Sequence, residues 1–587
     1  RSTTASNNVA VGSFTLDTNT TGDNNVAIGV EALEKNTTAN NNTAVGFQAL
    51  EENTTGTQNV AVGALALDAN TTASENTAVG YNALSSNTTG ANNTAIGLGA
   101  LRDNTASDNT AVGREALKVN SSGEQNVAVG ALALDANTTA SYLTAIGYAA
   151  LGNNTTGSGN LAVGRGALGA NTTGEENLAI GQAAVDACST GLRNTGVGYY
   201  ALSSVTTASD NTAVGRKALE DCTGTANSAV GKDALTNNTS GSYNVAVGAN
   251  ALDANTTADY NVAVGYGALG DNTTGNLNVA MGTGALGSNS LGDRNCAFGH
   301  NALTNFAPTS NADTYNSAFG LNALSATTTG THNTAFGGEA LSQNTTAVNN
   351  TAAGYAALYA NTTGQYNSAF GSHALNANTT ADGNTAVGYN AMSVNTTGTQ
   401  NVAVGTNALD ANTTASDLTA IGYESLSNNT TAGSNTGVGH RTLQKNTTGS
   451  QNSAGGREAL RENTTGARNT AFGAFALDAT TTSDNNTAVG AGALTNSTGS
   501  QNTAVGSDAL EDCTSGYGNV AVGRLAGYNI TDGQYNVCVG YRAGDNITTG
   551  DNNVSIGNDV EADGANNGNS IQIGHNFHGL GSNYFTF

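Results

Sequence analysis

One pentapeptide, typified by Asn59-Val60-Ala61-Val62-Gly63, returns along the chain about every 17 residues. Its glycine recurs 34 times between Gly12 and Gly574, and a few of the steps are 16 residues long. A fixed short period indicates a solenoid, in which each repeat forms one coil and stacks on its neighbours. The repeat therefore overrides the prior of about three or four separate domains for a chain of 587 residues.

The consensus coil reads Asn-(Thr/Val)-Ala-(Val/Ile)-Gly-x-x-Ala-Leu-x-x-Asn-Thr-Thr-Gly-x-x. Its first five residues alternate and are rich in β-branched side chains, which predicts a short strand. Alternation places Val45 on one face with Thr43, and Ala44 on the other. Neither face carries charge, so each strand needs two partners if both faces are to be buried. We expect the first partner to be the rest of the coil and the second to be a neighbouring chain.

The second leg of the coil, Gly-x-x-Ala-Leu, is compatible with two structures. Its leucines, such as Leu33 and Leu50, form an apolar row, and segments such as Arg114–Lys118 contain good helix formers. The leg is predicted as either a short helical turn or a second strand, and Asn-Thr-Thr-Gly as a turn. The predicted fold is mainly β, a parallel β-solenoid (β-roll) of 34 coils with a 17-residue repeat. At one strand spacing per coil, it would form a rod of roughly 160 Å.

An asparagine precedes almost every predicted strand, as at Asn25, Asn42 and Asn59. Stacked in register, these side chains should form a ladder in which each amide bonds the next coil. Leu143 and Leu418 occupy the same position and should break the ladder.

The repeat is interrupted once and changes near its end. Gly299 and Gly320 are 21 residues apart and enclose the only proline, Pro308, so residues 304–315 are predicted to form a loop that leaves the solenoid. We predict a shaft over residues 1–557 and an atypical capping or docking segment over 558–587, where the Ala-Leu and Asn-Thr-Thr elements are lost.

Both ends suggest contacts with other chains. Residues 2–4 fall inside a coil that has no cap, which is typical of truncation, cleavage or stacking on another subunit. The other end gathers aromatic residues that either dock on a neighbouring subunit, by strand addition for example, or fold back as a hydrophobic cap on the last coil. They are Phe577, Tyr584, Phe585 and Phe587.

Charge excludes several partners. The chain has 18 Lys and Arg against 43 Asp and Glu, a formal charge of −25, which disfavours nucleic acid and anionic membranes. No apolar run approaches the length of about 18 residues that a membrane-spanning helix needs.

No catalytic or cofactor motif is present in the sequence, which predicts a protein that is not an enzyme and has no cofactor. The six histidines fall at different positions of the repeat, and the pair His575 and His578 is interpreted as surface polar residues, not as metal ligands. Cys188, Cys222 and Cys513 occupy the position of the turn asparagine, and Cys296 and Cys538 lie in strands. Unpaired thiols are favoured over crosslinks between chains.

The turn motif Asn-Thr-Thr is also an acceptor for N-glycosylation. If the source glycosylates proteins, sugars would follow one edge of the rod, and otherwise the motif is only a turn. The candidate acceptors are Asn19, Asn36, Asn53, Asn70, Asn87, Asn137, Asn154, Asn171, Asn255 and Asn272.

The pentapeptides at residues 25–29 and 177–181 resemble the head repeats of YadA-like trimeric autotransporter adhesins, and equally the repeat shafts of phage tail fibres. Proteins of these families form trimeric, left-handed parallel β-rolls that project adhesive tips. The resemblance implies a homotrimer outside the cell, at a cell surface or on a virion. The 17-residue coil with its Asn-Thr-Thr-Gly turn is longer than the repeat of those families.

The sequence thus predicts a structural or adhesive extracellular fibre that associates with itself and contacts a glycan or receptor on a host surface. One alternative is the subunit of an end-to-end filament, glycosylated on its turns. Another is a carbohydrate-binding solenoid that uses exposed tyrosines after the repeat glycine, namely Tyr81, Tyr148, Tyr266 and Tyr389.

Overall fold

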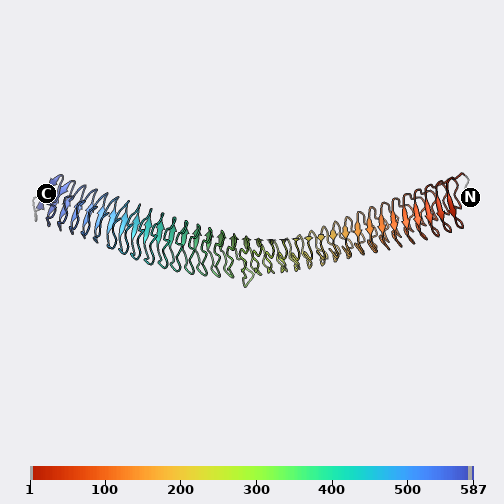
Figure 1. Cartoon of the computed structure of the whole chain (residues 1–587), viewed down its shortest axis with the longest axis horizontal. Coiled ribbons are helices and arrows are strands. Elements are labelled where there is room, and N and C mark those ends of the chain that lie inside the picture. The colour runs from red at the N-terminus through yellow and green to blue at the C-terminus, as the bar shows by residue number, and fades with distance from the viewer. Residues whose placement is uncertain (1–3, 563, 579–584, 587) are drawn as a thin grey trace. The chain divides into compact units, whose positions relative to one another are not determined.

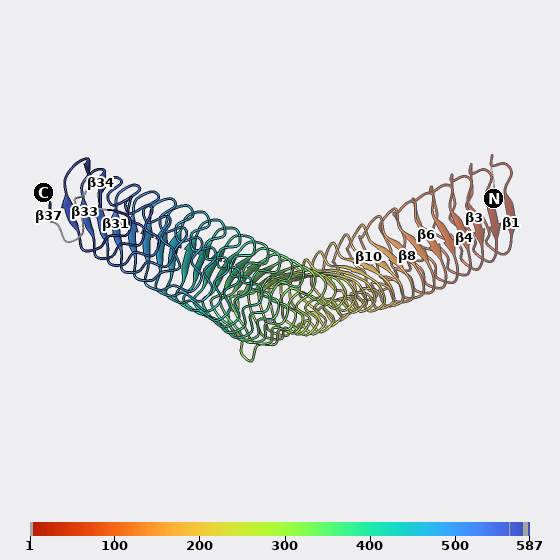
Figure 2. The same ribbon diagram turned by 60° about the vertical axis from the view of Figure 1, so that its left-hand side comes forward.

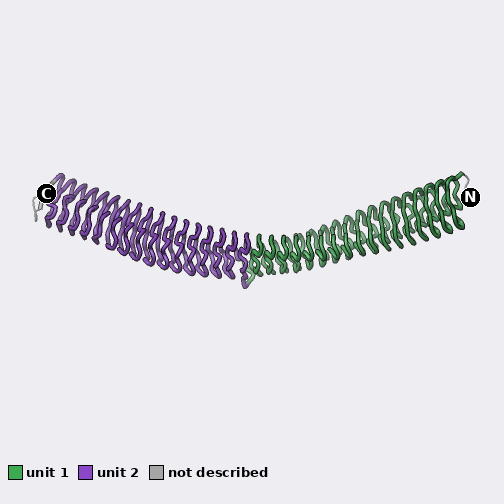
Figure 3. Tube along the Cα trace, viewed as in Figure 1, with its two compact units in different colours: residues 1–294, 310–312 green, residues 295–309, 313–587 purple. Residues whose placement is uncertain are grey.

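The computed structural model describes residues 4–562, 564–578 and 585–586, with backbone alone for 577–578 and 585–586. In this part of the chain the fold is a parallel β-solenoid without helices, in which successive coils stack strand on strand (Figure 1). The chain divides into two compact units (Figure 3), unit 1 being Arg1–Arg294 with Ser310–Ala312 and unit 2 being Asn295–Thr309 with Asp313–Phe587.

Unit 1 contains seventeen three-residue strands, several of which are labelled along one side of the unit in Figure 2. They are β1 (Val9–Val11), β2 (Val26–Ile28), β3 (Thr43–Val45), β4 (Val60–Val62), β5 (Thr77–Val79), β6 (Thr94–Ile96), β7 (Thr110–Val112), β8 (Val127–Val129), β9 (Thr144–Ile146), β10 (Leu161–Val163), β11 (Leu178–Ile180), β12 (Thr195–Val197), β13 (Thr212–Val214), β14 (Ser228–Val230), β15 (Val245–Val247), β16 (Val262–Val264) and β17 (Val279–Met281).

Unit 2 continues the same pattern and adds short strands near its end. Its strands are β18 (Cys296–Phe298), β19 (Ser317–Phe319), β20 (Thr334–Phe336), β21 (Thr351–Ala353), β22 (Ser368–Phe370), β23 (Thr385–Val387), β24 (Val402–Val404), β25 (Thr419–Ile421), β26 (Thr436–Val438), β27 (Ser453–Gly455), β28 (Thr470–Phe472), β29 (Thr487–Val489), β30 (Thr503–Val505), β31 (Val520–Val522), β32 (Val537–Val539), β33 (Val554–Ile556), β34 (Val560–Glu561), β35 (Ile571–Ile573), β36 (Phe577–His578) and β37 (Phe585–Thr586).

Within each unit, consecutive strands pair in parallel and in register. In β2 and β3, for example, Val26 lies opposite Thr43 and Ala27 opposite Ala44, so equivalent positions of the repeat stack directly. The central alanine of a repeat strand, such as Ala27 or Ala44, points into the coil and is fully buried. The predicted parallel β-solenoid with a 17-residue repeat is thereby confirmed.

The second leg is neither a helix nor a strand but a series of turns with alternating backbone handedness. In the Gly29 coil, Glu31 has φ 62° and Leu33 has φ 52°, both in the left-handed region. The N–H of Glu31 donates to the preceding coil, at Ser13 O (2.9 Å), while that of Leu33 donates to the following coil, at Ala49 O (3.0 Å). The leg therefore bonds to both neighbouring coils without forming a strand.

Two features require glycine directly after each repeat strand: the backbone conformation there and the close approach of the next coil. Gly46 has φ 144°, and a methyl group on it would lie 2.3 Å from the carbonyl oxygen of Gly63 in the next coil. No L-residue fits this position without moving the stack.

The predicted asparagine row before the strands does link successive coils, because each side-chain amide forms hydrogen bonds with backbone groups of the next coil. Asn25 Oδ1 accepts the backbone N–H of Asn42 (2.9 Å), and Asn42 Nδ2 donates to Gly56 O (2.9 Å). Leu143 still donates its backbone N–H to Asn126 (3.0 Å), and Leu418 does so to Asn401 (2.9 Å). Their apolar side chains offer no acceptor to the next coil, so the chain of amides is interrupted there as predicted.

The insertion and the end of the chain both preserve strand pairing within unit 2. Cys296 of β18 pairs with Ser317 of β19, although the two are 21 residues apart, so the additional residues leave the stack as a loop. After β33 the turns of the second leg give way to β34, whose Val560 pairs with Phe577 of β36. β37 pairs with β35, placing Phe585 opposite Ile571.

Candidate interaction face

The first and third residues of each repeat strand point away from the coil and form a continuous surface within each unit, which we call the strand face. Across β1–β33 and β35 this surface contains no charged residue. Its larger side chains are exposed to a degree that is unusual for apolar residues: 40% for Ile28, 40% for Ile96 and 62% for Phe336. Extended exposed apolar surfaces mark sites of interaction.

The dimensions of the strand face are those of a protein interface. The seventeen strands of unit 1 give a strip about 80 Å long and about 10 Å wide, from the strand spacing and the rise per residue. Such a strip has an area of about 800 Å², which equals the share of one partner in an interface of standard size.

In unit 2 the strand face carries a row of phenylalanines. The rings of Phe298 and Phe319 stack with centroids 5.0 Å apart, and Phe319 lies 5.7 Å from Phe336. Small residues interrupt the row farther on, and a methyl group on Gly455 would lie 2.6 Å from the ring of Phe472. The surface of unit 2 is therefore more uneven than the Val and Ile surface of unit 1.

A second exposed row follows the repeat glycine, at the border of the strand face. The four tyrosines singled out in the sequence occupy this row, with exposures of 53% for Tyr81, 52% for Tyr148, 64% for Tyr266 and 54% for Tyr389. Their exposure is confirmed, and they are too far apart in the stack to form one continuous aromatic surface.

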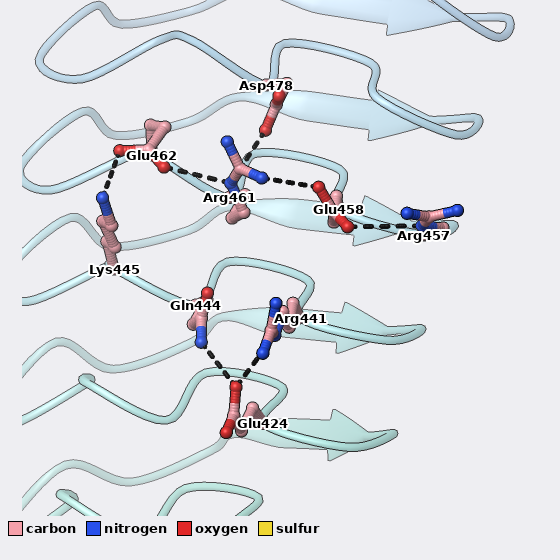
Figure 4. Close-up of polar contacts among 9 residues, drawn as sticks. All are labelled: Glu424, Arg441, Gln444, Lys445, Arg457, Glu458, Arg461, Glu462 and Asp478. Carbon is pink, nitrogen blue, oxygen red and sulfur yellow. Dashed lines mark hydrogen bonds and ion pairs between the residues drawn. The ribbon is translucent and has the colours of Figure 1, made fainter.

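Charged residues gather instead on the second leg, as in the part of unit 2 shown in Figure 4. Arg461 contacts Glu458 (2.6 Å) within its own coil and Asp478 (3.4 Å) in the next, and Lys445 pairs with Glu462 (2.6 Å). The pairs with Asp478 and Lys445 link successive coils. They belong to the stacking of the solenoid, and each exposed pair contributes only about 0–1 kcal/mol.

One carboxylate of this group receives several donors. Arg441 Nε (3.0 Å) and Gln444 Nε2 (2.7 Å) both donate to Glu424 Oε2 (Figure 4). Hydrogen bonding from Tyr423, together with the Arg441 guanidinium, outweighs desolvation and lowers the pKa of Glu424. Glu424 is therefore held ionised as a structural ion-pair partner.

The prediction that the Asn-Thr-Thr asparagines lie on an exposed edge is wrong. Their side chains are 0–1% exposed, and they form the amide ladder expected for the other asparagine row: Asn36 Nδ2 donates to Asn19 Oδ1 (3.0 Å) and to Ala39 O (3.1 Å). The nitrogen that would carry a glycan is thus enclosed and engaged in the folded chain. The same burial applies to all ten predicted acceptors, Asn19, Asn36, Asn53, Asn70, Asn87, Asn137, Asn154, Asn171, Asn255 and Asn272.

None of the five cysteines forms a disulfide with another cysteine of the same chain. Cys188, Cys222, Cys513 and Cys538 are buried, and Cys296 is half-buried on the strand face. Cys222 replaces a ladder asparagine and accepts a hydrogen bond from Asn238 Nδ2 (3.5 Å). Burial raises the pKa of Cys513 and Cys538 to about 12, so neither thiol ionises readily.

The aromatic residues predicted to dock are only partly described. The backbone of Phe577 and Phe585 lies in β36 and β37, which pair with strands of the same chain. This pairing favours the cap over strand addition to a neighbour. Tyr584, Phe587 and all four side chains lie outside the described residues.

Neither a metal site nor a membrane-spanning helix is found in the described residues. No group of three His, Cys, Asp or Glu side chains is placed to hold a metal ion there, and the side chain of His578 lies outside this part. The described residues also include no helix of the length and apolarity needed to cross a bilayer.

Comparison with known proteins assigns no family to the chain. No protein-family model matches it, and no curated protein matches it.

Proposed function

We propose that the protein is a structural fibre protein whose copies associate side by side through the strand face. The observation that carries this proposal is the absence of charge from the strand face, in a chain with a net charge of −25. Two copies meeting through other surfaces would bring acidic groups together, whereas the strand face can be buried without desolvating any charge.

The resemblance to trimeric adhesins and tail fibres supports three copies, with the three strand faces turned toward a common axis. It also supports a location at a cell surface or on a virion, where the fibre would present an adhesive region to a host glycan or receptor. Trimerisation, location and adhesion are parts of the proposal.

The test is the mass of the assembly measured by light scattering, for the native chain and for two matched variants. Val247→Lys with Met281→Lys places two charges on the strand face, at side chains that are each 39% exposed. Tyr243→Lys with Leu277→Lys places two charges in the same coils, on the exposed row just before the strands (53% and 46%). We expect the native chain and the second variant to be multiples of 58.2 kDa, and the first variant to be monomeric.

A mass of 58.2 kDa for the native chain would contradict the proposal. An open-ended rise of mass that persists in the strand-face variant would instead support the end-to-end filament.

A further inference from the structure

Two neighbouring coils of unit 1 have only glycine or alanine at positions where most other coils carry larger side chains. In the Gly147 and Gly164 coils, the second and fifth positions after the glycine hold Ala149, Gly152, Gly166 and Gly169. The equivalent positions elsewhere carry residues such as Asn, Glu, Lys or Ser. Their loss leaves a groove of about 460 Å³ on the second leg.

An aspartate closes each end of this groove. Asp186 Oδ1 lies over one end, where a methyl group on Gly169 would be 2.7 Å from it, and Asp135 Oδ1 lies over the other, 3.4 Å from a methyl group on Gly152. The two carboxylates are three coils apart, which is about 14 Å along the stack. Burial raises the pKa of both carboxyl groups, because neither is fully hydrated.

Aromatic and amide side chains border the same depression. A second groove of about 310 Å³ shares Ala149, Gly166 and Asp186 with the first and is lined by Tyr148, Arg165, Gln182 and Tyr200. The ring of Tyr200 meets that of Tyr199 edge-on at 4.4 Å.

We infer that this groove is a binding site for a short neutral oligosaccharide. Tyrosine rings offer a surface for the C–H face of a sugar, and carboxylates and amides accept or donate hydrogen bonds to its hydroxyls. An anionic ligand would be repelled by the carboxylates of Asp135 and Asp186, and a cationic ligand would be repelled by the guanidinium of Arg165. A neutral polyhydroxylated ligand can form hydrogen bonds with all of these groups and is repelled by none of them.

The same arrangement recurs later in unit 1. Tyr266 precedes Gly267 and Gly270, and Asp253 Oδ1 would lie 3.5 Å from a methyl group on Gly270. A methyl group on Gly267 would touch nothing within 4 Å, so this region is open as well. Other grooves differ in chemistry: the one beside Tyr389 has no carboxylate, and in the one beside Tyr541 the carboxylate of Asp545 is paired with Arg542.

The four post-glycine tyrosines therefore divide into two that border a glycine groove, Tyr148 and Tyr266, and two that do not. Tyr81 and Tyr389 are followed by asparagine and serine at the positions that are empty in the grooves. This division provides a matched control, because all four tyrosines are exposed to a similar degree.

The test is saturation-transfer NMR followed by calorimetric titration of the full chain with maltotetraose, cellotetraose and chitotetraose. We expect at least one of these neutral probes to bind, and Tyr148→Ala with Tyr266→Ala to weaken that binding about tenfold or more. Tyr81→Ala with Tyr389→Ala should leave it unchanged. Filling the first groove with Gly152→Ser and Gly169→Ser should reduce the number of sites, since serine already occupies this position in the Tyr81 coil.

Failure of all three probes to bind, or equal loss in both tyrosine pairs, would overturn the inference. The result is independent of the proposed self-association, which involves the strand face and is read from the mass of the assembly.

Discussion

Leucine adopts a left-handed backbone conformation in coil after coil, as at Leu33, Leu50 and Leu67 with φ between 52° and 55°. This conformation costs roughly 1–2 kcal/mol for an L-residue. Complete burial of the leucine side chain contributes about 1.5–3 kcal/mol and offsets that cost. The repeat is thus stable because the strained residue is also the largest regular core residue.

Exceptions at this position are compensated by their neighbours. Gly527 replaces the leucine in its coil, and Ile530 replaces the ladder asparagine, so that Ile530 Cδ1 would lie 2.9 Å from a methyl group on Gly527. Val185 is paired with Gly196, where a methyl group would lie 2.5 Å from Val185 Cγ2. In each case a larger side chain occupies the space that a smaller one leaves.

Replacing Leu67 by isoleucine tests the role of the left-handed conformation. Leu→Ile conserves volume, which alone costs less than about 1.5 kcal/mol, but β-branching adds strain of about 1–3 kcal/mol in this region. We expect clear loss of hydrogen-exchange protection in the coils next to Leu67→Ile. Leu67→Met is the control, since Met392 occupies the same position with φ 53°. Equal protection in the two variants would show that the conformation does not restrict the side chain.

A pH dependence is expected from Asp68 and Asp410. Desolvation raises the pKa of each to about 6, above the value of about 3.9 in an unfolded chain. The folded state therefore holds the proton more tightly. Protonation of these two carboxyl groups therefore stabilises the fold fully below about pH 4, and this stabilisation is lost as the pH rises through about 6.

We accordingly expect Asp68→Asn with Asp410→Asn to raise the melting temperature at pH 7 and to leave it unchanged at pH 4. Asp417→Asn with Glu75→Gln, both at exposed positions, removes the same two formal charges and is the control for general repulsion within the acidic chain. A melting temperature that changes equally in both variants would assign the effect to net charge.

The sequence contained evidence that the Asn-Thr-Thr asparagines are buried, although their identity suggested glycosylation. The residues that replace them include Cys188, Val205, Phe306 and Ile530, all uncharged and mostly apolar. Such replacements are typical of an interior position. The asparagine itself is typical of a turn. Only the residues that replace it in other coils indicate that this position faces the interior of the coil.

At the scale of the element, the strand could be predicted and the second leg could not. Alternation, β-branched residues and the repeat glycine together specify a strand such as β4. The Gly-x-x-Ala-Leu leg uses good helix formers in left-handed conformations, which are stabilised by hydrogen bonds to the coils on either side. Local propensity carries no information about bonds between coils.

The repeat glycine offers a direct test of coil stacking. Gly46→Ala would place a methyl group 2.3 Å from Gly63 O at φ 144°, so we expect destabilisation of about 3 kcal/mol or more. Gly99→Ala is the matched control: its φ of 63° is shared by residues such as Glu31, and a methyl group there would meet only Glu115 Cγ at 3.7 Å. We expect that change to cost about 1 kcal/mol. Exchange protection of the adjacent coils measures both, and equal effects would contradict the account.

At the scale of the whole molecule, the repeat produces one property that no single coil has. An outward Val or Ile is unremarkable alone, but stacking in register aligns these residues into an uncharged strip on each unit. The sequence predicted that both strand faces would be free of charge and that a neighbouring chain would cover one of them. It could not show how exposed that face is in a single chain, because exposure depends on the path of the second leg.

The most direct test of this account is the protection of a thiol on the strand face. In a Cys296→Ser background, Val264→Cys places a thiol on the face, and Tyr260→Cys places one in the same coil on the neighbouring exposed row. If copies associate through the strand face, maleimide should modify Val264→Cys slowly in the assembled protein and rapidly when Val247→Lys and Met281→Lys are added, while Tyr260→Cys should react rapidly in both. Equal rates for Val264→Cys with and without the two lysines would show that the strand face is open to solvent and would contradict association through it.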